Sequence, residues 1–365
     1  MTWGKTLKFS ATTFALLSSI VLTGCSASSS PTPTASKSQT PAFTLNWISA
    51  PLTGRQYIKE TNPQLDGPVV MGKIDNSFAA RPQGGLSKAD IVYEELVEGG
   101  ITRYLAIFHS QLPERFGPLR SVRPMDPDIA APYGGIIAYS GGQKPFVTAM
   151  RKTGLYNASE TSESTIRTMK RVKDREAPHN LFVLAQRLQA RHKHLKSPTS
   201  SLQFAESAFQ SSAYLLGKPV QTLVASYPET KARWDYDQNY GVFLRSQDGK
   251  KSVDADNHKV QISATNVFVI RVKVDRSFRD PRYGFVPKTL FEGKGKGQLM
   301  TAGKVIDILW SKKNQKSQAV FTTKDGKPIL VGTGNTWFEM VPTDVGNVKI
   351  TYRKVTTSPS PSPSK

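Results

Sequence analysis

The first half of the chain alternates apolar and polar positions over short stretches, which is typical of β-strands. Residues 90–97 and 101–108 alternate in this way, and the sequence Glu98-Gly99-Gly100 between them is typical of a hairpin turn. Residues 136–139 form a short apolar run that predicts a buried strand. A helix with Asn180 as its N-cap is predicted from apolar residues at helical spacing, namely Leu181, Leu184, Ala185 and Leu188.

Beyond about residue 220 the pattern becomes richer in strands. Short apolar or alternating runs predict strands over residues 232–236, 242–244, 265–274, 336–342 and 348–355, and the last two are expected to complete a meander. Residues 321–331 are expected to form a hairpin that turns at Asp325-Gly326. The fold class expected is therefore α/β (α+β), with a smaller β-rich domain at the C-terminal end.

The N-terminus has the layout of a secretory signal. Lys5 and Lys8 precede an apolar run over residues 9–22, which is too short to span a membrane as a helix. The sequence Leu22-Thr23-Gly24-Cys25 contains the one cysteine of the chain and resembles the lipobox of bacterial lipoproteins. That resemblance implies a lipid on the Cys25 thiol. The alternative is an ordinary signal followed by a chance cysteine.

Composition divides the rest of the chain. After a signal peptide over residues 1–24, residues 25–45 contain many Ser, Thr and Pro and few large apolar residues, so we expect a disordered tether. An α/β domain is expected over residues 46–200 and a β-rich domain over residues 220–355. Residues 356–365 repeat Ser-Pro and are expected to form a disordered tail.

Charge points to anionic partners. The 365 residues carry 49 Lys and Arg against 28 Asp and Glu, a formal net charge of +21. Such a field attracts lipid headgroups, phosphate-rich wall polymers or nucleic acid. Nucleic acid is the least expected of these, because acidic residues interrupt the basic ones. The alternative is that scattered lysines serve only solubility.

A series of sequence blocks resembles a known family. The blocks are Asp75-Asn76-Ser77, residues 80–86, residues 89–94, residues 98–103 and residues 117–124. In this order they resemble the YerB family of bacterial lipoproteins (DUF3048), from about Pro68 to Tyr352. Residues 332–337 before Val341-Pro342 resemble the smaller C-terminal domain of that family. The resemblance implies a layered sheet-and-helix sandwich and carries no known activity.

The first hairpin contains adjacent carboxylates. Alternation puts Glu94 and Glu98 on one face of its first strand and Glu95 on the other. One face must meet the core, so we expect Glu94 or Glu95 among apolar neighbours, where a carboxylate needs a partner. An arginine close in sequence could supply it, and the candidates are Arg81, Arg103, Arg120 and Arg123. The result is either a ligand pocket or a buried ion-pair network.

The sequence Arg120-Ser121-Val122-Arg123 precedes a proline, which favours a turn. A turn would bring its two arginines together beside Ser121, where they could bind a phosphate or carboxylate; alternatively, one arginine forms a salt bridge and the other faces solvent. His179 could cap a helix, bind a ligand or act as a base. The ligand-binding candidates are therefore Asn76, Arg81, Glu94, Glu98, Arg103, Arg120, Ser121, Arg123 and His179.

Catalytic signatures are sparse. There is no Gly-x-Ser-x-Gly sequence, no histidine or cysteine pattern for a metal, and no cofactor-binding motif. Glu94 and Glu98 could form an acid/base pair for glycan cleavage, which needs two carboxylates about 5–10 Å apart across a cleft.

The function expected first is a membrane-anchored lipoprotein on the extracytoplasmic side that binds or scaffolds without catalysis. Its partners would be the membrane, through Cys25, and an anionic or polyhydroxylated ligand, an anionic envelope polymer or an envelope protein. The alternative is an envelope hydrolase or transferase built on Glu94, Glu98, Arg103 and His179. Nucleic-acid or polyanion binding is the third.

Overall fold

The fold is taken from a computed structural model that describes residues 45–200, 202–282 and 284–353. Cys25, the expected signal, almost all of the expected tether and the expected Ser-Pro tail lie outside these residues. Within the described part, every helix is too short or too polar to cross a membrane.

The centre of the fold is a row of paired strands that run mostly in one direction. In spatial order these are β16 (Asn266–Asp275), β24 (Thr336–Pro342), β4 (Ile91–Leu96), β5 (Thr102–Phe108), β3 (Val70–Asp75), β6 (Ile136–Tyr139) and β7 (Tyr156–Ser159). Only β5 runs against its neighbours, because it is antiparallel to both β4 and β3. The expected hairpin over residues 90–108 is thus confirmed, and its turn uses Gly99 and Gly100 at positive φ.

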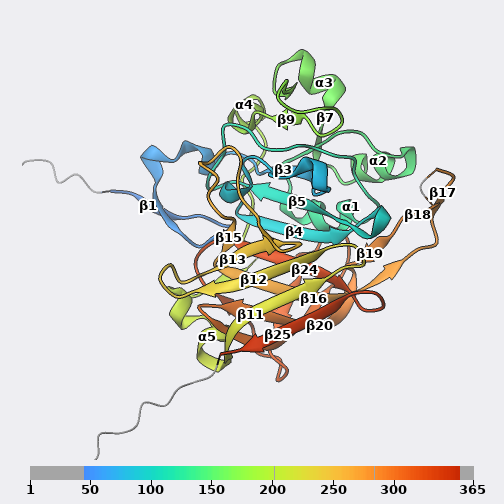
Figure 1. Cartoon of the computed structure of the whole chain (residues 1–365). Helices are drawn as coiled ribbons and strands as arrows, with labels where there is room; N and C mark the ends of the chain where they lie inside the picture. The colour runs from blue at the N-terminus through green and yellow to red at the C-terminus, as the bar shows by residue number, and fades with distance from the viewer. Residues whose placement is uncertain (1–44, 201, 283, 354–365) are drawn as a thin grey trace, which may run out of the picture. The chain divides into compact units, whose positions relative to one another are not determined.

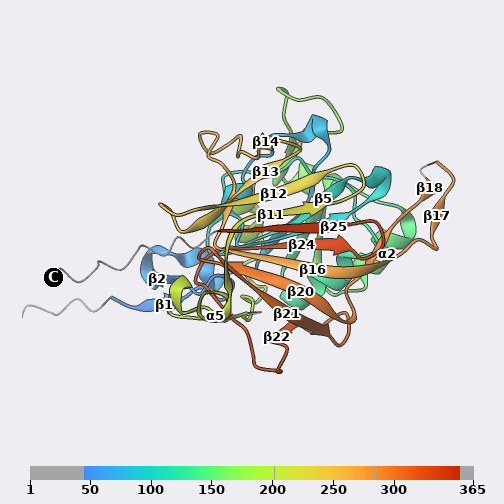
Figure 2. The same cartoon turned by 60° about the horizontal axis from the view of Figure 1, so that its bottom comes forward.

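The row extends past β16 into antiparallel strands, which Figure 2 shows in succession. These are β20 (Gly293–Thr301), β21 (Lys304–Lys312) and β22 (Val320–Thr322). A second layer contains β11 (Lys218–Ser226), β12 (Lys231–Asp237), β13 (Val242–Gln247) and β25 (Asn347–Tyr352). β11 also pairs with β21, so the second layer continues from the central sheet (Figure 1).

Apolar side chains pack on both faces of the central strands. On one face, Trp337 of β24 packs against Trp234 of β12 and Tyr104 of β5, with ring centroids 5.3 and 5.2 Å apart. On the other face, Tyr93 stacks on Phe338 at 4.4 Å, and this core includes apolar residues of α1 (Asp126–Ala130) and α2 (Lys144–Arg151). The layered α+β fold expected from the family resemblance is confirmed.

The remaining elements are short. The helices are α3 (Glu160–Thr165), α4 (Ala185–Arg191) and α5 (Ser212–Leu216). The strands are β1 (Trp47–Ser49), β2 (Gln56–Ile58), β8 (Met169–Arg171), β9 (Leu181–Val183), β10 (Gln203–Phe204), β14 (Lys250–Lys251), β15 (Ser263–Ala264), β17 (Arg279–Asp280), β18 (Gly284–Phe285), β19 (Lys288–Leu290) and β23 (Leu330–Val331).

Two details of the expected elements are wrong. Residues 181–183 form β9, paired with β8, and helix α4 begins only at Ala185, so Asn180 is not its N-cap. β24 lies between two parallel strands and not beside β25, so no meander closes the chain. The expected hairpin over residues 321–331 is confirmed, because Thr322 pairs with Pro328 in an antiparallel bridge and the N–H of Ile329 donates to the Phe321 carbonyl at 3.1 Å across the turn. β22 also pairs with β21, and β23 pairs with β10.

The two sequence segments share one sheet, because β24 from the C-terminal segment pairs with β4 from the N-terminal segment. The division into domains over residues 46–200 and 220–355 stays a prediction about how the sequence is organised.

Candidate functional site

Polar residues gather where the parallel strands end. β3, β4, β6 and β7 run in one direction, so their carboxyl ends and the start of β5 lie at the same edge. Asp75 ends β3, Glu98 follows β4, and Arg103 lies at the start of β5. Ligand sites in sheets of this kind are commonly found beyond the carboxyl ends of the strands. This edge is therefore the first place to look for a site.

Asp75 is the centre of this edge. One carboxylate oxygen, Oδ2, accepts a hydrogen bond from Nδ1 of His179 at 2.7 Å and lies 3.1 Å from Nε of Arg120. The other, Oδ1, accepts a hydrogen bond from the backbone N–H of Ser77 at 3.0 Å. The Asp75 side chain is 1% exposed, whereas those of His179 and Arg120 are 22% and 29% exposed. The cation and the imidazole therefore cover the carboxylate and face solvent.

Two more arginines lie beside this centre. Nε of Arg123 pairs with Oε2 of Glu98 at 2.7 Å, and Nη1 of Arg103 donates to the backbone carbonyl of Ser121 at 3.0 Å. Burial and, to a lesser degree, the nearby charge of Arg123 lower the pKa of Arg103 to about 10. Nε of Arg103 is buried without a hydrogen-bond partner among the described residues. We call the set Asp75, Glu98, Arg103, Arg120, Arg123 and His179 the carboxyl-edge cluster.

Backbone hydrogen bonds hold the segment that carries two of these arginines. The N–H of Arg120 donates to the carbonyl of Lys73 on β3 at 2.8 Å, and its carbonyl accepts from Ser140 after β6 at 3.0 Å. The N–H of Val122 donates to Gly141 at 3.1 Å. The segment is thus held between the ends of two strands, which fixes the backbone positions from which the side chains of Arg120 and Arg123 extend.

A buried ion group supports the cluster from below. Lys73 on β3 pairs with Glu95 on β4 and with Asp126 of α1, the latter at 2.6 Å, and all three side chains are 0% exposed. Burial lowers the pKa of Lys73 to about 8, against the opposing effect of Asp126. Asp126 also accepts the backbone N–H of Arg123 at 2.6 Å. The group therefore links the sheet interior to the arginine segment.

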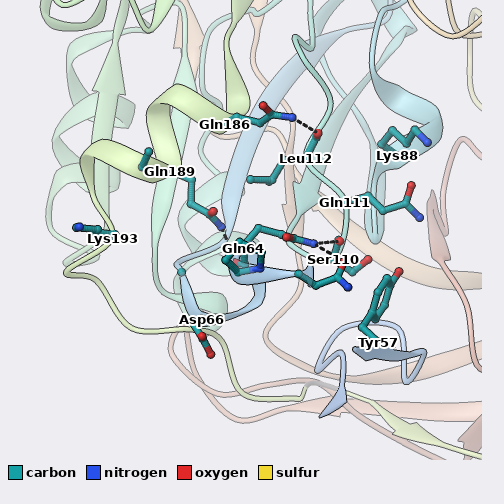
Figure 3. A pocket seen from close by; sticks show the side chains of 14 residues that line it. Tyr57, Gln64, Asp66, Lys88, Ser110, Gln111, Leu112, Gln186, Gln189 and Lys193 are labelled. Atoms are coloured by element: carbon teal, nitrogen blue, oxygen red, sulfur yellow. Dashed lines mark hydrogen bonds between the residues drawn. The ribbon is translucent and has the colours of Figure 1, made fainter. Parts of the chain in front are cut away.

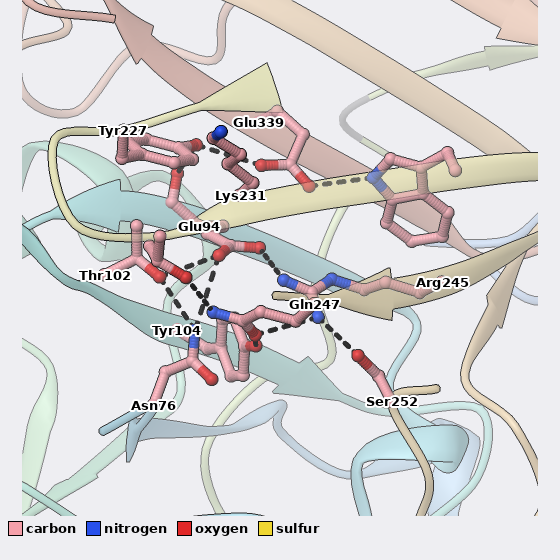
Figure 4. A network of polar contacts seen from close by, with 12 residues as sticks. Asn76, Glu94, Thr102, Tyr104, Tyr227, Lys231, Arg245, Gln247, Ser252 and Glu339 are labelled. Atoms are coloured by element: carbon pink, nitrogen blue, oxygen red, sulfur yellow. Dashed lines mark hydrogen bonds and ion pairs between the residues drawn. The ribbon is translucent and has the colours of Figure 1, made fainter. Parts of the chain in front are cut away.

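A second network lies sealed between the two layers (Figure 4). Oε2 of Glu94 pairs with Nη2 of Arg245 from β13 at 2.7 Å, and Oε1 accepts from Thr102 at 2.7 Å and from Asn76 at 3.4 Å. Glu94, Arg245 and Asn76 are each 0% exposed. Arg81, at the rim, donates to the Asn76 carbonyl and pairs with Asp248 at 2.7 Å.

Glu339 completes this second network. It accepts from Trp234 Nε1 at 2.8 Å and from the Tyr227 hydroxyl at 2.9 Å. Burial raises the pKa of Glu339 to about 8, and the charge of Glu94 adds to the rise. Glu94, Arg245 and Glu339 thus form a buried ion network between β4, β13 and β24, which we call the interlayer network.

The expected site residues therefore separate into two sets. The structure brings Glu98, Arg103, Arg120, Ser121, Arg123 and His179 together at the carboxyl edge, and their role in binding stays a prediction. It seals Asn76 and Glu94 inside the interlayer network. Using Glu94 with Glu98 as an acid/base pair is wrong, because an external glycan cannot reach Glu94. Both Glu94 and Glu95 are buried, since both faces of β4 are covered.

The sequence interpretation missed three residues that matter here. Asp75 was available as the last residue of a strand, a position where polar side chains share an edge. Arg245 and Glu339 are the partners within the interlayer network, and Arg245 lies 151 residues from Glu94 along the chain. No local pattern connects them. Among the described residues, no group of three or more His, Cys, Asp or Glu is placed to hold a metal ion.

The fold and site together define a mixed α+β protein whose two segments share one sheet and expose an arginine-rich cluster at its carboxyl edge. The chain belongs to the DUF3048 family. "Protein of unknown function (DUF3048) N-terminal domain" matches residues 52–197, and the corresponding C-terminal domain matches residues 223–338.

A relative and a solved structure agree with this assignment. The chain is 29% identical over 303 residues to a Bacillus subtilis (strain 168) protein named "Putative lipoprotein YerB"; the match covers 81% of this chain and 86% of YerB. It is also similar to the crystal structure of the Bacillus subtilis YerB protein, with a TM-score of 0.68 and 26% identity, over 83% of this chain and 99% of that one. These matches come with no described activity.

Proposed function

We propose that this protein is a lipoprotein anchored to the extracytoplasmic side of the cell membrane through Cys25, and that its carboxyl-edge cluster binds an anionic group. The N-terminal sequence and the name of YerB support the anchor. The ligand would carry a phosphate or carboxylate, as anionic envelope polymers and many envelope proteins do. The protein would bind this ligand without catalysing a reaction.

One observation carries the proposal: among the described residues, Arg120 pairs with Asp75 and Arg123 with Glu98, whereas Arg103 beside them forms no ion pair within 4.0 Å. Burial is the main cause that lowers the pKa of Arg103 to about 10, and the charges of Arg123 and Arg120 contribute to the lowering. An added anion would relieve this repulsion. Guanidinium groups also match phosphate and carboxylate oxygens with paired hydrogen bonds.

Access to solvent supports the same site. Arg120 and His179 are partly exposed, while the buried Lys73 group fixes the backbone beneath them. A site that is held before the ligand arrives loses less entropy on binding. Arg120 is therefore the residue that we expect to contact the anion first.

The hydrogen bond between Asp75 and His179 favours a second candidate function. A carboxylate on Nδ1 orients an imidazole so that Nε2 can take a proton from water or a hydroxyl group. On an anion held by the arginines, this would give a hydrolase or transferase. Glu94 has no part in it, because it is sealed in the interlayer network.

The test is ligand-dependent thermal stability of the full-length protein in detergent. Inorganic phosphate and citrate should raise the melting temperature, because a ligand that binds the folded state stabilises it. Arg120→Gln should remove the shift, whereas Arg233→Gln, an exposed arginine on β12, should keep it. Equal shifts in both variants, or no shift with either ligand in the parent protein, would contradict the proposal.

The two candidate functions differ in turnover. Release of nitrophenol from p-nitrophenyl phosphate or p-nitrophenyl acetate, lost in His179→Asn while phosphate still raises the melting temperature, would favour the enzyme. Absence of turnover with intact binding supports the binding function.

A further inference from the structure

A cavity of about 750 Å³ opens at the other edge of the central strands, where β5 ends and β3 begins. Figure 3 shows its lining, which comes from β2, the segment before β3, the loop after β5 and helix α4. Its volume lies in the range of about 300–1,000 Å³ that is common for small-ligand sites. It shares no residue with the carboxyl-edge cluster.

Five neutral amides line this cavity, and its charged residues are Asp66, Lys88 and Lys193. Asn62, Gln64, Gln111, Gln186 and Gln189 all line it, together with the ring of Tyr57. Nε2 of Gln64 and Nε2 of Gln189 each already donate twice within the protein, so these amides offer their carbonyl oxygens to sugar hydroxyls, whereas Nε2 of Gln186 donates once and keeps a second N–H. An aromatic ring with a polar tip can cover the C–H face of a sugar. The lining chemistry therefore suits a polyhydroxylated ligand.

The amides are held in place by the backbone. Nε2 of Gln64 donates to the Ser110 carbonyl at 2.9 Å, and Nε2 of Gln186 donates to the Leu112 carbonyl at 3.3 Å (Figure 3). Gln189 is 7% exposed and donates to the Pro68 carbonyl at 2.8 Å. Groups whose orientation is already fixed lose little entropy when a ligand binds.

A second cavity of about 480 Å³ adjoins the first, because Gln186 lines both. It is lined by three cations, Arg167, Lys170 and Arg187, and one acidic residue, Glu114. Within the described part of the chain, none of the three cations forms an ion pair with a carboxylate within 4.0 Å. They are therefore available to an anionic ligand.

We propose that the two cavities form one groove that binds an acidic oligosaccharide. Sugar hydroxyls bond the amides of the first cavity, and a carboxylate or phosphate on a neighbouring sugar pairs with Arg167, Lys170 and Arg187. Gln186 lies where the two meet and contacts both parts of the ligand. This groove is separate from the anion site at the carboxyl edge, so either one can fail without the other.

The test is isothermal titration of the full-length protein with three probes: tetragalacturonate, which is acidic, maltotetraose, which is neutral, and tripolyphosphate, which has no sugar. Tetragalacturonate should bind at least tenfold more tightly than the other two. Gln186→Ala should weaken it by tenfold or more. Arg187→Gln should weaken tetragalacturonate and leave maltotetraose unchanged, whereas Lys349→Gln, which makes the same charge change on exposed β25, should alter neither.

Three results would overturn the groove: no measurable binding of tetragalacturonate, tripolyphosphate binding that equals it in the Arg120→Gln variant, or tetragalacturonate binding that Gln186→Ala leaves unchanged. Gln111→Ala serves as a second amide variant, so that the conclusion does not depend on how one substitution folds. Arg120→Gln should leave tetragalacturonate binding intact, which separates this test from that of the carboxyl-edge cluster.

Discussion

Replacing Arg245 with Met removes the cation of the interlayer network. This cation links β13 in the second layer to Glu94 on β4 in the central sheet. Nη2 of Arg245 lies 2.7 Å from Glu94, and both side chains are at most 1% exposed. The guanidinium also lies 5.0 Å from the ring centroid of Trp337 and 5.9 Å from that of Trp234. Methionine can fill much of the same space, so lost charge and not lost volume dominates the effect.

The expected cost is about 3–5 kcal/mol of unfolding free energy, which is typical when one partner of a buried ion pair is removed. It arises because Glu94 keeps its hydrogen bond from Thr102 but loses its cation, while Glu339 close by is already hard to ionise. Glu94→Gln should cost less, since Glu339 can then ionise and pair with Arg245. The double variant should cost less than the sum of the two single variants, by about 0.5–3 kcal/mol.

Urea unfolding of the full-length protein, followed by tryptophan fluorescence, measures the free energy of unfolding of the parent protein, of Arg245→Met, of Glu94→Gln and of the double variant. Arg233→Met on β12 is the matched control; its side chain is half exposed and its ion pair should contribute at most about 1 kcal/mol. A cost below about 1 kcal/mol for Arg245→Met, or strict additivity in the double variant, would refute the view that the pair acts as a buried unit.

Other predictions concern the remaining charged groups and the anchor. Lys73→Met should cost about 3–5 kcal/mol in urea unfolding, because Glu95 and Asp126 stay buried without their cation; a loss below 1 kcal/mol would argue against this. The pKa of Glu339 is raised from 4.5 to about 8, so the folded state binds a proton that the unfolded state releases, and stability should fall as pH rises from about 4.5 to 8. Glu339→Gln should flatten that decline in urea unfolding at pH 5 and pH 8, and an unchanged slope would be contrary evidence. Cys25→Ser should move the protein from the membrane fraction to the soluble fraction on cell fractionation; retention on the membrane would exclude the lipid anchor.

Local patterns predicted much of the fold correctly. The hairpin over residues 90–108 follows from alternation plus a glycine turn, and both signals lie within one short stretch. The strands predicted within residues 232–244 and 265–274 are present for similar reasons, since β12, β13 and β16 carry their own apolar faces. Such elements depend on residues that are neighbours in sequence, so a single sequence is enough to predict them.

The sequence could not predict which strands pair with each other when they lie far apart along the chain. β24 lies in parallel between β16 and β4, and parallel partners are not joined by a turn that a sequence would reveal. The run Leu181–Val183 is too short for its period to separate strand from helix, and pairing with β8 decided the outcome.

The same distinction explains the sites. Arg120 and Arg123 were recognisable because they lie three residues apart, before a proline. A buried carboxylate was expected at Glu94 or Glu95, but its partner was expected among arginines close in sequence. The real partner, Arg245, comes from a strand in the other segment.

The most direct test of the central proposal is NMR of the arginine Nε–H groups during titration with inorganic phosphate. Assignment by single substitution would identify the signals of Arg103, Arg120, Arg123 and the exposed control Arg233. An anion site at the carboxyl edge predicts that the first three signals shift together and saturate, while the Arg233 signal stays in place. Unmoved signals for the three clustered arginines, or equal unsaturated shifts for all four, would contradict it.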